Sequence, residues 1–379
     1  MADTDLSLFA ACLPGLEPLL LGELEELGVR GAQIVPGGVE FTGGCRELYR
    51  ANLCAGVATN VLLRLESFTC RHLAQLRARA ERAPWQQAIG PGQPFALRVS
   101  CKQSKLYHSG AVGERIAKAI TASCGGVHAE DDPDALTIAV RVHRDVVSLS
   151  FDTSGEPLHR RGWRLQTGKA PLREDLARAL LLATGWSRDT MLVDPMAGSG
   201  TIAIEAACMA RGLAPGRLRS FAFQRSALFD DALWSSVRAD AEQQALDAAP
   251  AMILASDRDA GGVEAAAANA ARAGVADDIQ LSRAAFSAAP VLAGELAADA
   301  RGALICNPPH GKRIGNHHAL RDLYAALGNR VSELPAAWKV GLLVADRRLA
   351  LRSGLNLSTA FLVSHGGVKV RALTGAAGG

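Results

Sequence analysis

The sequence predicts an α/β protein in which two small α+β units precede a larger domain built on a parallel sheet. Three observations lead to this prediction. The chain has 379 residues, enough for two or three domains. Short strand and helix patterns alternate up to about residue 155. From about residue 172, helices alternate with apolar strands in the manner of βαβ units. We place the domains at residues 1–63, 64–155 and 156–379.

The first unit reads strand, helix, strand, helix, strand. Its apolar segments have strand or helix spacing, and Gly28 ends the first helix. The expected strands are 8–13, 37–43 and 60–68, and the expected helices are 16–28 and 47–58. Alternating short elements of this kind are typical of a small α+β unit.

The second unit begins with a helix over 72–89 that breaks at Pro84. A strand at 95–102 and a helix at 109–123 follow, and 136–154 reads as a hairpin with its turn near Arg144 and Asp145.

In the third domain the helices and strands alternate more regularly. We expect helices at 172–186, 201–212, 263–274 and 324–334, and strands that begin at 191, 252, 303 and 338. This order predicts a parallel sheet covered by helices on both faces.

Composition excludes several classes of protein. No apolar run reaches the roughly 18 residues that span a bilayer, and the first residues lack the basic start of a secretory signal. The eight cysteines are never closer than nine residues, so no zinc-site spacing is present and we expect no metal. Scattered thiols favour a cytoplasmic protein with reduced cysteines.

The formal net charge of +3 hides a segregation of charge along the chain. Residues 64–118 hold ten basic and three acidic side chains, and 156–173 hold five and one, whereas 1–63 hold three and eight. Two basic segments in a near-neutral chain suggest a face that binds a polyanion such as RNA or DNA. The alternative is a set of solvated helix faces, because Arg77, Arg79 and Arg82 follow an ordinary amphipathic pattern.

The strongest local signal is an apolar strand that ends in Asp194 and runs into a loop of small residues. Gly198 and Gly200 allow a close approach of backbone to a ligand, and the next helix offers free N–H groups. The loop is neither a P-loop nor a dinucleotide GxGxxG. An acid before the loop suits an ammonium group, which favours S-adenosylmethionine; a plain βα turn is the alternative. The candidate cofactor residues here are Asp194, Met196, Ala197, Gly198, Ser199, Gly200 and Thr201.

A second acid, Asp257, closes the next expected strand and is followed by Arg258. A carboxylate at that position can accept both ribose hydroxyls of a bound nucleoside. The same residues also suit the N-cap of the following helix. We include Asp257 and Arg258 among the candidate cofactor residues.

The third motif, Asn307-Pro308-Pro309-His310, ends another apolar strand. Two prolines remove two N–H donors and fix an extended backbone with exposed carbonyls. The Asn307 amide oxygen and the Pro308 carbonyl can then accept both hydrogens of an exocyclic amine, and His310 can stack on its base. A rigid turn at the end of the strand is the alternative. These four residues are the catalytic candidates; Cys306 is expected in the core.

The motifs Asp-Pro-Met-Ala-Gly-Ser-Gly-Thr and Asn-Pro-Pro-x-Gly resemble those of class I methyltransferases that modify exocyclic amines. The segments from Cys12 and from Lys102, and the linker from Leu158, resemble the ferredoxin-like unit, THUMP domain and linker of the THUMP-domain RNA guanine-N2 methyltransferases. The resemblance covers nearly the whole chain. It implies a Rossmann-like class I methyltransferase domain that uses S-adenosylmethionine to methylate guanine N2 in RNA, with ribosomal RNA favoured.

Two residues depart from the family's pattern. His310 stands where the family usually has Tyr or Phe, and Ala284 and Ala285 stand where an acid often meets the adenine amine. An imidazole at position 310 stacks more weakly than a phenyl ring. Without the acid, either cofactor binding is weaker or the backbone and Phe286 hold the adenine.

Within the basic segments we expect phosphate contacts, which position an RNA without reading its sequence. The candidates are Arg98, Lys102, Lys105, Arg115, Arg160, Arg161 and Arg164. Interdomain salt bridges are the alternative for the last three. Tyr107 and His108 are expected to pack or cap within their domain.

Three other functions remain open from the sequence. The substrate is a transfer RNA instead of ribosomal RNA, or the chain is an RNA-binding or assembly protein without turnover, or it is a DNA adenine methyltransferase. The two N-terminal units argue against the last. The oligomeric state stays open.

Overall fold

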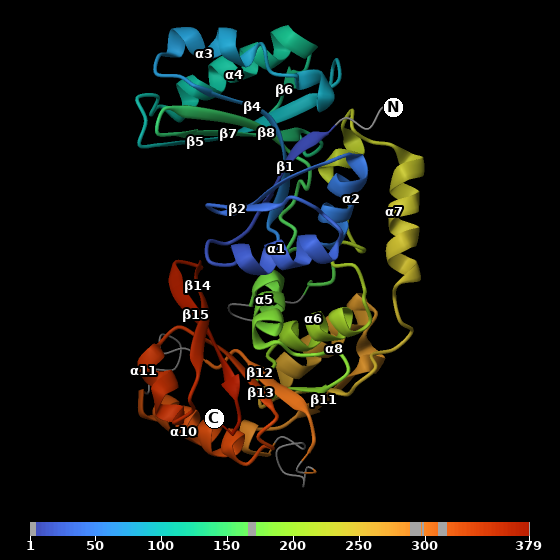
Figure 1. The fold of residues 1–379 in the computed structure, drawn as a ribbon, viewed down its shortest axis with the longest axis vertical. Helices are drawn as coiled ribbons and strands as arrows, with labels where there is room; N and C mark the ends of the chain where they lie inside the picture. Colours follow the sequence, from blue (N-terminus) through green and yellow to red (C-terminus); the bar gives the residue numbers. More distant parts are fainter. Residues whose placement is uncertain (1–4, 166–171, 289–296, 298, 310–316, 379) are drawn as a thin grey trace. The chain divides into compact units, whose positions relative to one another are not determined.

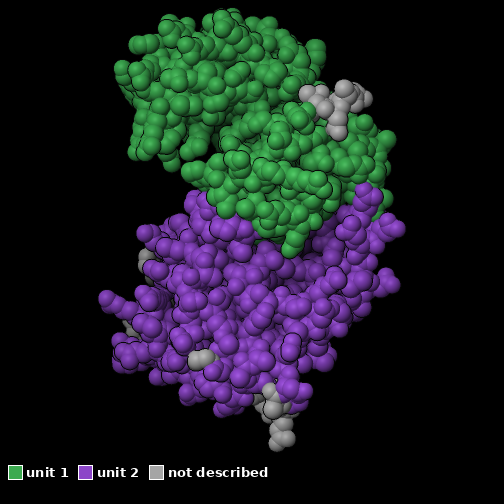
Figure 2. Space-filling model, viewed as in Figure 1, with its two compact units in different colours: residues 1–12, 20–158, 219–239 green, residues 13–19, 159–218, 240–379 purple. Residues whose placement is uncertain are grey.

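The computed structural model describes residues 5–165, 172–288, 297, 299–309 and 317–378. The chain forms two compact units, which are coloured separately in Figure 2. Unit 1 consists of residues 1–12, 20–158 and 219–239, and unit 2 of residues 13–19, 159–218 and 240–379. Each unit therefore includes a segment that interrupts the other along the chain.

Unit 1 is built on one eight-stranded sheet with the order β2-β3-β1-β4-β8-β7-β5-β6. The strands are β1 (Leu6–Ala11), β2 (Gln33–Val35), β3 (Gly38–Gly43), β4 (Asn60–Thr69), β5 (Pro94–Lys102), β6 (Val127–His128), β7 (Leu136–His143) and β8 (Val146–Asp152). The helices are α1 (Glu17–Glu26), α2 (Cys45–Cys54), α3 (Leu73–Ala80) and α4 (Ser109–Cys124), and a 3-10 turn, η1, spans Trp85–Gln87. The short strand β6 at the sheet edge was not among the expected elements.

The long strand β4 joins the two halves of this sheet. It pairs with β1 on one side, from Leu8↔Leu63 to Ala11↔Asn60, and with β8 on the other, from Leu62↔Asp152 to Thr69↔Val146. The expected division at residue 63 therefore falls inside one strand.

Helices α3 and α4 lie side by side over one face of the β5–β7–β8 part of the sheet (Figure 1). β5 and β7 run parallel, connected through α4, and alternate residues of β7 are buried. β7 and β8 form the expected hairpin, whose two turn residues, Arg144 and Asp145, have φ of 52° and 64°. Positive φ at both positions defines the tight turn that matches strand twist, and Asn-Gly is its usual sequence.

Residues 219–239 complete unit 1 with the 3-10 turn η2 (Ala222–Arg225) and most of α7 (Asp231–Gln243). The Tyr49 hydroxyl donates to the carbonyl of Leu228 at 2.6 Å and accepts from the N–H of Asp230 at 2.8 Å. Its ring stacks on Phe223 at 4.4 Å and meets Trp234 edge-on at 5.9 Å. This aromatic cluster, and α7 with it, was not predicted from the sequence.

Unit 2 contains a seven-stranded sheet with the order β11-β10-β9-β12-β13-β15-β14. The strands are β9 (Met191–Asp194), β10 (Ile253–Asp257), β11 (Ile279–Arg283), β12 (Gly302–Cys306), β13 (Lys339–Val344), β14 (Ser358–His365) and β15 (Val368–Ala376). The helices include α5 (Glu174–Thr184), α6 (Thr201–Ala210), α8 (Ala260–Ala273), α10 (His317–Ser332) and α11 (Arg347–Ala350), with 3-10 turns η3 (Ala276–Asp278), η4 (Phe286–Ala288) and η5 (Leu351–Ser353). The closing β14–β15 hairpin was not predicted.

The five strands from β11 to β13 are parallel, and β15 and β14 are antiparallel. The chain first fills the sheet outward from β9 through β10 to β11, then returns to place β12 on the other side of β9. This reversal of strand order leaves a crevice at the carboxyl ends of β9 and β12, where open α/β sheets bind ligands. The predicted α/β fold class is confirmed.

Candidate cofactor and substrate site

The glycine loop follows β9 and leads into α6. Gly198 and Gly200 have φ of 53° and 82°, which non-glycine residues adopt only with strain. A β-carbon on Gly200 would lie 2.9 Å from that of Ala266, so α8 packs directly against the loop. Among the described residues, a β-carbon on Gly198 would meet no atom within 4 Å. The backbone at Gly198 is therefore open for a ligand to approach.

Asp194, the last residue of β9, is 1 % exposed. One carboxylate oxygen, Oδ1, accepts from the N–H of Met196 at 3.3 Å, while Oδ2 is buried without a partner among the described residues. Burial, together with the nearby charge of Asp257, raises the pKa of this carboxyl to about 8. A cationic ligand group would satisfy Oδ2 and restore the ionised form. The site therefore fits the ammonium group that the sequence argument places there.

Asp257 lies at the end of β10, next to β9, and braces the glycine loop. Its Oδ2 accepts from the N–H of Gly198 at 2.8 Å and its Oδ1 from the N–H of Asp259 at 2.9 Å. A carboxylate oxygen has two lone pairs, so each oxygen keeps one acceptor position for a ribose hydroxyl. Asp259 holds the N-cap position of α8, but its side chain makes no capping bond.

The remaining loop residues are arranged around these two acids. The N–H of Ala197 donates to the carbonyl of Ser256 at 2.9 Å, and the carbonyl of Ser199 accepts from Asn269 at 3.1 Å. Thr201 is buried at the start of α6, and Arg258 is exposed after β10. Contacts of these residues with a cofactor stay predictions.

Asn307 and Pro308 follow β12, the other neighbour of β9. The Asn307 amide oxygen, Oδ1, is buried without a partner among the described residues. A buried acceptor without a partner costs about 1–3 kcal/mol, so it indicates a position kept for a donor. Cys306, in the strand, is fully buried, and burial raises the pKa of its thiol well above the usual value. Cys306 is a core residue.

His310 was expected to stack on the substrate base, and Phe286 was one candidate to hold the adenine of the cofactor. His310 lies outside the described residues, so its stacking role stays a prediction. Phe286, in η4, is buried in the hydrophobic cluster that contains Leu304 and Tyr324. It packs in the core of unit 2 at the end of β11.

Three family models match consecutive parts of the chain. Residues 161–368 match the RMKL-like methyltransferase domain (UPF0020), residues 7–62 the RlmL ferredoxin-like domain and residues 70–152 the THUMP domain. The first match contains all three motifs at the strand ends. The chain belongs to this methyltransferase family. Its cofactor is S-adenosylmethionine, and the resemblance inferred from the motifs is confirmed.

The methyltransferase has relatives over its whole length. A Synechocystis sp. protein, slr0064, provisionally named as an RNA methyltransferase, is 32 % identical over 367 residues, 95 % of this chain and 94 % of the relative. The structure of SMU.472, a provisionally assigned methyltransferase complexed with SAH, is 27 % identical with a TM-score of 0.88 over 99 % and 98 % of the two chains. A Listeria monocytogenes structure described as a predicted N6-adenine-specific DNA methylase is 28 % identical with a TM-score of 0.86 over 97 % and 96 %.

Two of the arginines expected to bind RNA are instead interior residues of the methyltransferase domain. Arg161 is 2 % exposed, and its Nε lies 3.2 Å from Oε1 of Glu205. Arg164 bonds to Glu174 at 2.7 Å and to the Thr201 hydroxyl at 2.8 Å. The expectation of phosphate contacts at Arg161 and Arg164 was therefore wrong, because both guanidiniums hold the linker against α5 and α6.

The crowding of cations in this linker also affects His159. Burial, together with the charges of Arg173 and Arg161, lowers the pKa of its imidazole to about 3. Among the described arginines of the linker, Arg160 is exposed, Arg161 is buried, and Arg164 and Arg173 are half-buried.

Arg160 is exposed in unit 2, and the remaining expected RNA contacts lie in unit 1. For all of these residues, contact with RNA stays a prediction. Lys102 and Lys105 are exposed, and Arg115 is half-buried and donates to the carbonyl of Ala111 in its own helix. Arg98 is 64 % exposed, but its guanidinium lies 3.7 Å from Asp152, which is 1 % exposed. Arg98 therefore also compensates a buried charge.

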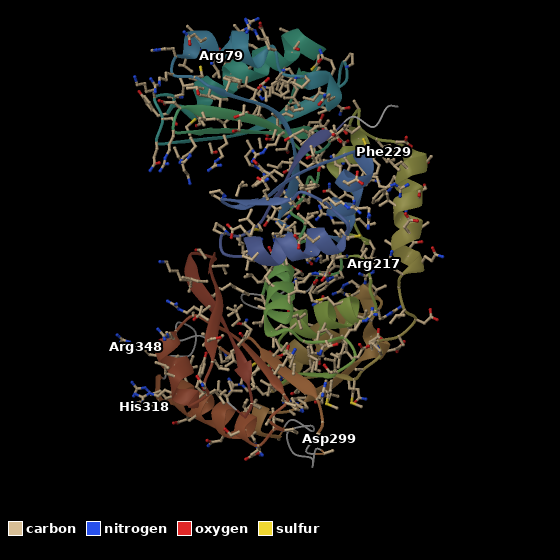
Figure 3. The ribbon with its side chains drawn as sticks, in the orientation of Figure 1. Arg79, Arg217, Phe229, Asp299, His318 and Arg348 are labelled. Atoms are coloured by element: carbon tan, nitrogen blue, oxygen red, sulfur yellow. The ribbon has the colours of Figure 1, made fainter. Side chains whose placement is uncertain are left out.

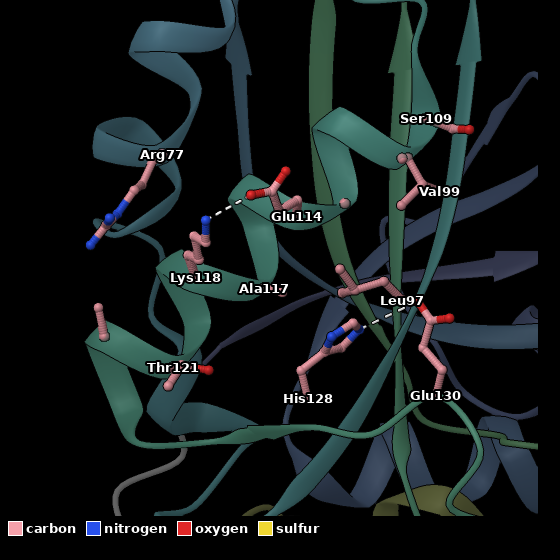
Figure 4. A pocket seen from close by; sticks show the side chains of 13 residues that line it. Arg77, Leu97, Val99, Ser109, Glu114, Ala117, Lys118, Thr121, His128 and Glu130 are labelled. Atoms are coloured by element: carbon pink, nitrogen blue, oxygen red, sulfur yellow. Dashed lines mark hydrogen bonds and ion pairs between the residues drawn. The ribbon is translucent and has the colours of Figure 1, made fainter.

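A groove of about 810 Å³ lies in unit 1 between α4 and β5 (Figure 4). The strand-end motifs belong to unit 2. Lys118 and Glu114 form an ion pair at its wall, at 2.7 Å, and His128 Nε2 lies 3.5 Å from Oε1 of Glu130. Because Glu114 and Glu130 both line the groove, we assign no phosphate ligand to it.

Sequence reasoning missed a group of cations beside the catalytic motif. Arg347, Arg348 and Arg352 are exposed on α11 and η5, directly after β13, the strand that pairs with β12. Figure 3 shows the side chains of Arg348 and His318 directed outward on one side of unit 2. The sequence pattern that could have located this group is the pair Arg347-Arg348, directly after the apolar strand expected at 338–346.

Two further properties concern the described part of the chain. It contains no helix long and apolar enough to cross a membrane. It also contains no group of three or more side chains suited to hold a metal ion.

Proposed function

We propose that the chain methylates RNA, transferring the methyl group of S-adenosylmethionine to the exocyclic N2 amine of a guanosine in ribosomal RNA. The observation that carries the proposal is the pair of buried oxygens without partners, Asp194 Oδ2 and Asn307 Oδ1, at the carboxyl ends of two adjacent strands. One suits an ammonium group and the other an amine hydrogen. The THUMP match and the provisional name of slr0064 support RNA as the substrate. The choice of ribosomal RNA rests on the resemblance of the sequence motifs.

The cofactor-binding roles follow from the strand ends. S-adenosylmethionine supplies an electrophilic methyl group when bound. Asp194 holds the ammonium group of its amino acid end, the open backbone at Gly198 lies beside it, and Asp257 accepts from the ribose. None of these groups needs to move a proton during the transfer.

The substrate roles belong to the Asn307 motif. The Asn307 amide oxygen and the Pro308 carbonyl accept the two N2 hydrogens, which orients the nitrogen lone pair towards the methyl carbon. Bound S-adenosylmethionine would supply the methyl carbon to this nitrogen and leave as S-adenosylhomocysteine, and the proton lost by the nitrogen would pass to solvent. His310 stacks on the base, and Arg347, Arg348 and Arg352 contact the flanking phosphates.

The central test is the identity of the modified nucleoside. Ribosomal RNA from a strain that lacks the gene is incubated with labelled S-adenosylmethionine, digested and resolved by mass spectrometry. N2-methylguanosine is expected. Methyladenosine would show that the target base is adenine. Label found only in transfer RNA would change the substrate class. RNA binding without methyl transfer would make the chain a binding or assembly protein.

Asn307→Ala separates the catalytic role from cofactor binding. Transfer should fall by about a hundredfold or more, because a positioned acceptor is lost, while the affinity for S-adenosylmethionine measured by calorimetry stays close to that of the wild type. The matched control is Asn329→Ala, an exposed asparagine on α10. Full activity in Asn307→Ala would remove this residue from the mechanism.

A further inference from the structure

Tyr107 is an exposed aromatic side chain in a strongly basic part of unit 1. It is 80 % exposed, the highest value among the large apolar side chains of the described residues. The expectation that it packs within its domain was therefore wrong, whereas His108 does cap α4 by accepting from the N–H of Ala111 at 3.1 Å. Because a single exposed apolar residue needs no explanation by itself, its surroundings decide what it does.

The loop that presents Tyr107, residues 103–108, is held firmly. Its neighbour Leu106 is 4 % exposed and anchors it in the core. The N–H of Lys105 donates to Asp145 at 2.8 Å, and the N–H of Asp145 donates to the Ser104 hydroxyl at 3.0 Å. These bonds tie the loop to the β7–β8 turn, so the ring of Tyr107 is presented on a fixed support.

The same place concentrates backbone strain. Gln103, Arg144 and Asp145 are the non-glycine residues of the described chain with positive φ, at 50°, 52° and 64°. Each costs about 1–2 kcal/mol relative to an ordinary conformation. Strained residues that the surrounding structure enforces are frequent at ligand-binding sites. The turn uses Arg-Asp instead of Asn-Gly, which places the Asp145 carboxylate against Lys105 and Arg71.

The charges around Tyr107 suit a polyanion. The loops at this end of the sheet, residues 70–72, 102–108 and 143–146, contain four basic residues and one acid. The N–H of Lys105 donates to the carboxylate of that acid, Asp145. This hydrogen bond and the charge of Arg71 hold the pKa of the Asp145 carboxyl below its usual value. The exposed cations Lys102, Lys105 and Arg144 therefore dominate beside the ring.

The adjoining sheet face continues this basic surface. Leu97 and Val99 of β5 lie against α4, so the alternate residues Arg98, Ser100 and Lys102 face the opposite side. Arg141 of β7 is the register partner of Ser100 and is exposed on that face. This open face ends at the loop of Tyr107.

We propose that Tyr107 is a stacking platform for an unpaired base of the RNA substrate, and that Lys102, Lys105 and Arg144 hold the adjacent phosphates. This inference rests on RNA being the substrate, as proposed above. Stacking on an aromatic ring tolerates any base and is available only to bases outside a duplex. The platform therefore selects RNA with a single-stranded segment.

The test compares two RNA probes by fluorescence anisotropy: a 12-nucleotide single strand and a 12-base-pair duplex. Stacking on an aromatic residue is worth about 1–3 kcal/mol per base, so Tyr107→Ala should weaken single-strand binding by about 5- to 100-fold. Tyr107→Phe, which keeps the ring, should bind nearly as the wild type does. Duplex binding should change little in either variant. Ile34→Ala, a truncation of another exposed apolar side chain in unit 1, is the control.

A 2-aminopurine base in the single strand reports stacking directly, because its fluorescence is quenched in a stack. Quenching by the wild type and by Tyr107→Phe, with loss in Tyr107→Ala, supports the platform. Three results would overturn it: unchanged single-strand affinity in Tyr107→Ala, an equal loss in Tyr107→Phe, or an equal loss of duplex affinity. Failure of the wild type to bind or methylate any RNA would instead refute the proposed function, so the two failures are distinguishable.

Discussion

Replacing Asp194 with asparagine should stabilise the cofactor-free protein while weakening cofactor binding. The substitution keeps the shape of a side chain that is 1 % exposed and removes a charge that the interior disfavours. Burial raises the pKa of Asp194 to about 8 in the folded chain, against about 3.9 for an unfolded aspartate. The folded wild type therefore binds one more proton than the unfolded chain between these two values.

The sign of the pH dependence follows from this difference. Because the folded state holds the extra proton, the wild type loses stability as pH rises from about 4 to 8, by about 1.4 kcal/mol per pH unit. The substituted asparagine cannot ionise, so the advantage of Asp194→Asn should grow by roughly 3–4 kcal/mol between about pH 5 and pH 8 and level off at higher pH.

Urea unfolding of both proteins at half-unit pH intervals measures this difference. Asp189→Asn, an exposed carboxylate before the other end of β9, controls for the loss of one charge. A stability difference that does not vary with pH would refute the reasoning about Asp194.

Cofactor binding supplies the second half of the test. A charge-assisted hydrogen bond is worth about 1.5–3 kcal/mol, so Asp194→Asn should weaken S-adenosylmethionine binding by about 10- to 100-fold. Calorimetry of the wild type at pH 7 in buffers of different ionisation enthalpy should show release of close to one proton, which Asp194→Asn should lack. Equal proton release in both proteins would place the ammonium group elsewhere.

Three further predictions concern other parts of the chain. Arg161→Met should destabilise the protein by about 3–5 kcal/mol in urea, because Glu205 is left buried and unpaired, and adding Glu205→Leu should recover most of the loss without changing RNA affinity. Gly200→Ala should lower the unfolding free energy by about 1–2 kcal/mol, because φ is 82° and the new β-carbon would lie 2.9 Å from a side chain of α8; unchanged stability would mean that the loop relaxes. Lys102→Ala with Lys105→Ala should flatten the slope of log affinity against log salt by about 1.4 for single-stranded RNA, and an unchanged slope would move the RNA-binding face elsewhere.

The strand-end motifs could be predicted because their geometry is local. Asp194, Asp257 and Asn307 each follow an apolar strand in the sequence, and parallel strands bring their carboxyl ends to one edge. The same information was enough for the fold class.

Contacts between distant residues could not be predicted in this way. The sequence of the basic segment does not show that Arg161 pairs with Glu205, 44 positions later. Buried and exposed arginines of that segment therefore could not be distinguished from the sequence. Tyr107 was expected to pack or cap within its domain. Its exposure depends on Leu106 taking the inward position.

Residues 219–239 belong to unit 1 but are synthesised after residues 159–218 of unit 2. Chains usually fold from the N-terminus as they emerge from the ribosome, at about 5–20 residues per second. Here the chain reaches Leu158 with the partners of Tyr49 still unmade, since Leu228 and Asp230 lie in the later segment. At those rates, roughly 4 to 16 seconds of translation separate the synthesis of Leu158 from the completion of residues 219–239. During that interval the nascent chain lacks the residues that cover Tyr49, and a fragment that ends at residue 158 would lack them permanently.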